Sequence, residues 1–131
     1  QALISLREDL HEGRLVSLFG CGGNRDTGKR PLMAEISEAY ADLVVVTSDN
    51  PRFEDPDAII QEIKQGFKAP EAPTILIEAD RAAAIALAIA RSEKGDIILI
   101  AGKGHEDYQI LGDREIYFSD FAEVEKNNEE L

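Results

Sequence analysis

The sequence has little cysteine, little positive charge and no long apolar run. Cys21 is the single cysteine among 131 residues, so no disulfide can close within the chain, and we expect a reducing compartment. Because no histidine stands beside it to act as a base, we interpret Cys21 as a small residue of a tight turn rather than a nucleophile. No apolar run approaches the ~20 residues that a membrane span requires, and we expect no signal peptide.

Positive charge is scarce, because 14 Lys and Arg face 26 Asp and Glu, which gives a net charge of −12. This balance argues against sequence-independent nucleic-acid binding and against docking on anionic lipid, since both need a cationic surface. It leaves room for an anionic small molecule, because local cations can focus an anion into a cleft of an acidic protein. Five cations fall in or beside the polar segments considered below: Arg25, Lys29, Arg30, Arg52 and Lys103.

Hydrophobic periodicity predicts that helices and strands alternate along most of the chain. Apolar runs predict strands at 15–19, 43–47, 74–77 and 96–101. Helical spacing predicts helices at 2–12, 32–41, 55–66 and 80–92, then a hairpin of 108–111 and 115–118, and a last helix from 119. The alternation implies right-handed crossovers and a three-layer, Rossmann-like α/β fold, in which helices flank a mostly parallel sheet with an antiparallel edge hairpin. We expect residues 1–131 to form a single domain, and we expect it to be a fragment of a longer protein because the chain opens inside a helix.

Three local features carry more detailed expectations. Asp55 is placed to cap a helix that has Pro56 at its first position. The strand at 96–101 is apolar on both faces and is therefore expected near the centre of the sheet. The helix at 32–41 is expected to bury a face formed by Leu32, Met33, Ile36 and Tyr40.

Three short polar segments stand where buried strands should end. They are 20–31 (GCGGNRDTGKRP), 49–52 (DNPR) and 102–106 (GKGHE). In an open parallel sheet, the loops at the carboxyl ends of the strands gather along one edge and form the ligand crevice. Glycines there let backbone amides approach an anion, while Arg, Asn and Glu side chains supply direction and selectivity. The three segments therefore predict one site for a polar, charged ligand.

The first segment comes close to two nucleotide-binding motifs and matches neither. A dinucleotide fingerprint would need a glycine where Arg25 stands. The phosphate-loop pattern fits from Gly23 to Lys29, but Arg30 then occupies the position where a Ser or Thr hydroxyl should hold magnesium. We therefore do not assign this segment as the main nucleotide cradle, although Arg25 or Lys29 can still contact a phosphate or a carboxylate near a helix start.

The second and third segments offer the groups that recognise an amino acid. Arg52 presents a planar fork that binds a carboxylate through two hydrogen bonds. Asp49 can accept from an ammonium group, and Asn50 can both donate and accept. Glu106 offers a further ammonium contact, and Gly102 allows close backbone approach. No Cys/His spacing supports zinc, and no nucleophile can be paired with a base, so we name no catalytic residue and no metal ligand.

Taken together, the motifs at 19–26 (FGCGGNRD), 29–31 (KRP), 49–52 (DNPR) and 102–109 (GKGHEDYQ) resemble the C-terminal domain of the Mur ligases. The resemblance runs over about residues 13–124, and it is closest to the members that add meso-diaminopimelate. The family is cytoplasmic and builds the peptidoglycan stem peptide. It uses ATP and magnesium to form an acyl phosphate on a nucleotide precursor, which the amine of the incoming amino acid attacks.

The resemblance implies substrate-binding roles for Arg25, Asp49, Asn50, Arg52, Gly102 and Glu106. Arg52 would hold the distal carboxylate that distinguishes diaminopimelate from lysine. Asn50, Gly102 and Glu106 would hold the distal amine and neighbouring groups, and Arg25 would position the amino acid or the phosphate side.

The resemblance also implies partners that these residues do not contain. ATP and Mg²⁺ would bind mainly to a central domain, and the nucleotide of UDP-MurNAc-dipeptide would bind to an N-terminal domain. The chain alone is therefore expected to be inactive, with neither a nucleic acid nor a membrane as its partner.

Two alternatives stay open at this point. One is a Mur-type domain of other specificity, such as a lysine-adding member, against which Arg52 argues. The other is a non-catalytic nucleotide- or anion-binding module that shares the doubly wound fold, because a fold alone does not determine a function.

Overall fold

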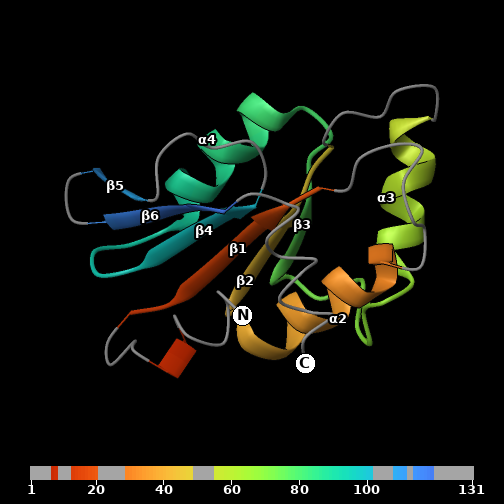
Figure 1. Ribbon diagram of the computed structural model, residues 1–131, viewed down its shortest axis with the longest axis horizontal. Coiled ribbons are helices and arrows are strands. Elements are labelled where there is room, and N and C mark those ends of the chain that lie inside the picture. Colours follow the sequence, from red (N-terminus) through yellow and green to blue (C-terminus); the bar gives the residue numbers. More distant parts are fainter. Residues whose placement is uncertain are drawn as a thin grey trace.

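The computed structural model describes residues 7–8, 13–20, 29–48, 55–101, 108–111 and 114–119. Within these ranges the chain forms one six-stranded sheet with helices on both faces (Figure 1). The strands are β1 (Leu15–Phe19), β2 (Leu43–Val46), β3 (Ile75–Ile77), β4 (Ile97–Ala101), β5 (Tyr108–Leu111) and β6 (Arg114–Ser119). The helices that pack on them are α2 (Lys29–Tyr40), α3 (Pro56–Lys64) and α4 (Arg81–Arg91).

The sheet has the order β3-β2-β1-β4-β6-β5, and all neighbours are parallel except β5 and β6. The mostly parallel, Rossmann-like sheet expected from the alternation of elements is therefore confirmed. The hairpin is also present, but only one of its two strands, β5, runs antiparallel to the rest of the sheet. Its second arm, β6, lies beside β4 and runs parallel to it.

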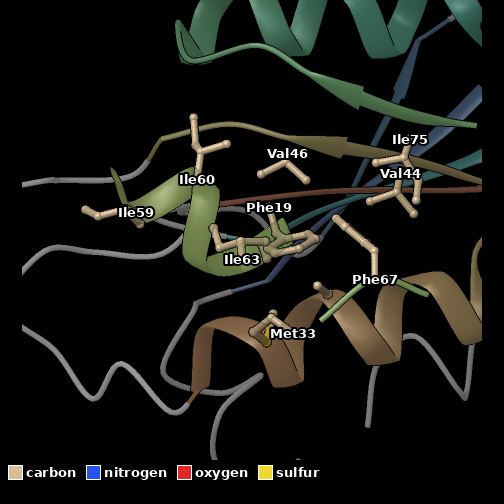
Figure 2. Packing of buried hydrophobic residues seen from close by; sticks show 11 residues of the cluster. Phe19, Met33, Val44, Val46, Ile59, Ile60, Ile63, Phe67 and Ile75 are labelled. Atoms are coloured by element: carbon tan, nitrogen blue, oxygen red, sulfur yellow. The ribbon is translucent and has the colours of Figure 1, made fainter. Parts of the chain in front are cut away.

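The helices form two outer layers on the sheet. On one face, α2 and α3 cover a cluster that includes Phe19, Val46 and Ile63 (Figure 2). On the other face, Ala84 and Ala88 of α4 pack against the alternate residues of the central strands. Every residue of β1 is buried, because this strand is covered on both faces and paired on both edges. The core thus sits around β1, as expected for a parallel sheet between helices.

The helix α2 differs from the expectation in its start and in its buried face. It begins at Lys29, three residues before the expected 32. The inward positions include Met33 and Ala34, but also Arg30 and Ser37. Tyr40 is 36% exposed, and Leu32 and Ile36 are only partly buried.

Both inward polar side chains of α2 have partners. Ser37 hydrogen-bonds to Ser17 of β1 with an Oγ–Oγ distance of 3.0 Å, and Arg30 pairs with α3. Apolar periodicity alone could not place them inside.

Two aspartates cap the starts of helices. The side chain of Asp55 accepts a hydrogen bond from the amide of Asp57 at 3.0 Å, with Pro56 as the first residue of α3, so the expected cap is confirmed. Asp80 makes the same contact with the amide of Ala82 at the start of α4. Such caps satisfy amides that a helix start leaves without partners.

At the amino edge of the sheet, Gly13 and Gly95 approach each other closely. Both have positive φ angles, 82° and 87°. A Cβ on Gly13 would lie 2.3 Å from the carbonyl oxygen of Gly95, whereas a Cβ on Gly95 would meet nothing within 4 Å. The two glycines therefore share a backbone constraint and differ in the space around them.

We expect Gly95→Ala to lower the free energy of unfolding by about 1–2 kcal/mol, the cost of left-handed backbone for an L residue. Gly13→Ala should cost clearly more, because it adds a steric overlap with backbone to the same conformational cost. Urea unfolding of the two variants and the unchanged chain measures both losses. An equal decrease in the free energy of unfolding for both variants would show that the close contact between Gly13 and Gly95 does not constrain the fold.

Candidate functional site

The carboxyl ends of the parallel strands lie level with one another. Phe19 of β1 pairs with Val46 of β2, and Leu18 pairs with Ile100 of β4. The last residues of β1, β2 and β4 therefore form one row across the sheet. The chain enters the three polar segments directly beyond this row, at Gly20, after Ser48 and after Ala101.

The centre of this row is the topological switch point of the sheet. From β1 the chain moves outward through β2 to β3, and it then returns to the other side of β1 as β4. In open α/β sheets, ligands bind outside the carboxyl ends of the strands at such a switch point. The segments that follow β1 and β4 flank it, and the segment that follows β2 is the next one along the edge. The topology thus supports the expectation of one shared site.

The end of β2 is held by the carbonyl of Ala79, which follows β3. This oxygen accepts from the Oγ of Ser48 at 2.6 Å, from the Oγ1 of Thr47 at 3.3 Å and from the amide of Ser48 at 3.4 Å. The amide of Thr47 in turn donates to the carbonyl of Phe19 at 2.9 Å. These contacts determine where the chain leaves β2 toward Asp49.

The six residues expected to bind substrate all lie outside the described residues: Arg25, Asp49, Asn50, Arg52, Gly102 and Glu106. What the structure describes is where their segments start and end. Arg25 lies between Gly20 and α2, the DNPR motif lies between Ser48 and the capped start of α3, and Gly102 follows Ala101 of β4. Their roles therefore remain predictions.

Arg81 is a residue of this edge that the sequence analysis did not identify. It opens α4, and its Nη2 donates to the carbonyl of Ala101, the last residue of β4, at 3.3 Å. A signal was present in the sequence, because Asp80-Arg81 follows a predicted strand just as the three polar segments do. The stretch around it lacks the glycines and side-chain amides that mark those segments.

Arg30 does not belong to the loop rim where its sequence position placed it. Its side chain is 1% exposed, and its Nη1 donates to the Oε2 of Glu62 on α3. The residue at the magnesium position of the near-match phosphate loop is thus a buried cation in an ion pair between two helices. A guanidinium cannot coordinate magnesium, which a Ser or Thr hydroxyl at this position would do.

The described residues hold no group of three or more His, Cys, Asp or Glu side chains that could bind a metal. Nor is any helix in this part of the chain long and apolar enough to cross a membrane. Two open hollows of about 280 and 410 Å³ lie beside α2 and α3 and are lined by no residue of the strand ends. In the first, the carboxylate of Glu38 is already engaged by the amides of Lys68 and Ala69.

The fold is a doubly wound α/β domain, the class in which ligands bind at the switch point of the sheet. Residues 1–104 match the family model described as "Mur ligase, glutamate ligase domain". The chain belongs to this family, the C-terminal domain of the Mur ligases.

Relatives with high sequence identity include proteins named UDP-N-acetylmuramoyl-L-alanyl-D-glutamate–2,6-diaminopimelate ligase. The protein of this name from Parasynechococcus marenigrum is 57% identical over 115 residues, which are 88% of this chain and 23% of the relative. The one from Coxiella burnetii is 49% identical over 126 residues, 96% of this chain and 25% of the relative. A solved structure with the same name superposes on this chain with a TM-score of 0.71 at 39% identity. The match covers 99% of this chain and 28% of the chain in that structure. The chain thus spans about a quarter of the length of the curated relatives that it matches.

If Arg30 stabilises the packing of α2 on α3, removing its partner must weaken the fold. We expect Glu62→Ala to lower the free energy of unfolding by about 1–3 kcal/mol, because it takes an acceptor away from a buried charge. Glu71→Ala, at an exposed acid of the connector after α3, is the matched control and should change it by less than about 0.5 kcal/mol. Chemical denaturation measures both, and equal stability of the two variants would contradict the structural role of Arg30.

Proposed function

We propose that this chain is the amino-acid-binding C-terminal domain of a three-domain, ATP-dependent ligase that adds meso-diaminopimelate to UDP-MurNAc-L-Ala-D-Glu in peptidoglycan synthesis. The observation that carries the proposal is the common row of strand ends, from which three segments with amino-acid-binding groups depart. The names of its relatives support the same reaction. The proposed enzyme works in the cytoplasm, as the family does.

The proposed recognition divides the two ends of the amino acid between the segments. Arg52 binds the distal carboxylate through its planar guanidinium, which can form two parallel hydrogen bonds with it. A lysine side chain at this position could not match the carboxylate in this way. Asn50, Asp49 and Glu106 receive the distal ammonium group, with Gly102 allowing the backbone to come close. A ligand held in this way keeps its other amine free to act as the nucleophile.

The remaining parts of the reaction lie with groups that the described residues do not supply. Arg25 lies on the segment after β1 and orients the amino acid toward the activated carboxylate. ATP with Mg²⁺ supplies the activation in this family, and we assign its binding mainly to the central domain, because Arg30 is occupied by packing. The role of this chain is then to bind and orient the nucleophile.

The test of the specificity is Arg52→Ala in the full-length ligase that contains this chain. The unchanged enzyme should prefer meso-diaminopimelate to lysine, and the variant should lose roughly 10- to 100-fold in kcat/KM for diaminopimelate, the equivalent of one charge-assisted hydrogen-bond pair. Arg91→Ala, at the exposed end of α4, is the control and should keep the preference. A preference for lysine in the unchanged enzyme would favour a lysine-adding ligase instead.

A second prediction concerns the chain by itself. Since it would supply recognition without activation, the purified 131-residue chain should release no phosphate from ATP and form no amide with meso-diaminopimelate and UDP-MurNAc-dipeptide. A coupled phosphate assay and mass spectrometry of the product measure this, with the full-length ligase as the positive control. Turnover by the isolated chain would refute the division of labour. ATP binding that ignores the amino acid would favour a nucleotide-binding module.

A further inference from the structure

Arg81 joins the start of α4 to the end of β4 at the switch point. Its Nη2 donates to the carbonyl of Ala101 at 3.3 Å, while its Nη1 is buried and has no hydrogen-bond partner among the described residues. No carboxylate of these residues forms an ion pair with it either. The two acids next to it in sequence are engaged by amides: Glu78 accepts from the amide of Asp80 at 3.1 Å, and Asp80 accepts from that of Ala82 at 3.0 Å.

Arg81 as a whole is only partly buried, but its Nη1 is shielded from solvent and has no hydrogen-bond partner in the described part of the chain. A donor in this state gives up its hydration without gaining a hydrogen bond, and this costs stability. Native folds leave few buried polar groups without partners, so such a group calls for an explanation other than packing.

Arg14, at the opposite end of α4, shows what a structural arginine looks like in the same layer. Its Nη2 donates to the carbonyl of Arg91 at 2.6 Å and to the Oδ2 of the buried Asp96 at 3.2 Å. It therefore has a counter-ion, and it lies at the amino edge, away from the switch point. Arg14 and Arg81 each have one buried nitrogen without a partner among the residues that the structure describes. They differ in two respects: Arg14 has a counter-ion and lies at the amino edge of the sheet, whereas Arg81 has none among the described residues and lies at the carboxyl edge.

We propose that Arg81 is a positioning residue of the amino-acid site, which acts by fixing the carbonyl of Ala101 and with it the strand end beside the switch point. The last peptide of β4 is held by its sheet pairing with β6 on one side and by Arg81 from α4. Its direction determines how the chain leaves the sheet toward Gly102. This inference rests on the proposed function and adds a residue to it from the face of the sheet that α4 covers.

The experiment compares R81M, R81K and R14M in the full-length ligase, by steady-state kinetics and thermal unfolding. R81M should raise the KM for the amino acid roughly tenfold, change kcat and the KM for ATP by less than about twofold, and leave the melting temperature equal or higher. R81K keeps one donor and should raise that KM only about threefold. R14M removes the counter-ion of Asp96 and should lower the melting temperature without changing the KM.

Two outcomes would overturn the proposal: an unchanged amino-acid KM in the Arg81 variants, or a fall in melting temperature in R81M as large as that in R14M. If R81M does not fold, the KM for the amino acid and the melting temperature of R81K test the proposal in its place. The proposed function is judged separately, by the preference of the unchanged enzyme for diaminopimelate over lysine. The effect of Arg81 is measured with whichever amino acid that enzyme uses.

Discussion

The structure depends on the burial of β1 between two parallel neighbours. Leu15–Phe19 is buried over its whole length, with helices on both faces and with β2 and β4 on its two edges. A strand in this position must satisfy its amides and carbonyls by pairing on both sides, since no water reaches them. The pairing sets the register, and the register brings the ends of β1, β2 and β4 to one level. The geometry of the candidate site thus follows from a requirement of the core.

The same core explains why a near-match to a phosphate loop need not bind phosphate. Arg30 has the charge and the sequence position to contact an anion, but its side chain forms an ion pair with Glu62 between α2 and α3. Gly66 adds to this packing, because a Cβ there would lie 1.9 Å from the carbonyl oxygen of Pro31. The first turn of α2 is therefore built for contact with α3. In the proposed function, recognition of the amino acid is assigned to the segments beyond the strand ends.

Much of the fold could be predicted from the sequence, because most elements here obey a single local rule. The strand at 15–19 was placed to the residue, since a short apolar run between polar breaks has few other solutions. The cap at Asp55 was also correct. The inward face of α2 was predicted only in part. Met33 is buried as expected, but Arg30 and Ser37 are buried through partners far away in sequence, which no periodicity reveals. The position of Arg81 after a predicted strand places it at the edge of the strand ends, but its contact with the carbonyl of Ala101 exists only in the folded chain.

The central claim is that three segments distant in sequence bind one ligand at the switch point. A crystal structure of the full-length ligase with meso-diaminopimelate tests it most directly. The account predicts that the ligand lies beyond the ends of β1, β2 and β4, with its distal carboxylate on Arg52. A ligand bound at the amino edge, near Gly13 and Gly95, or against the exposed side of α2 and α3, would contradict it.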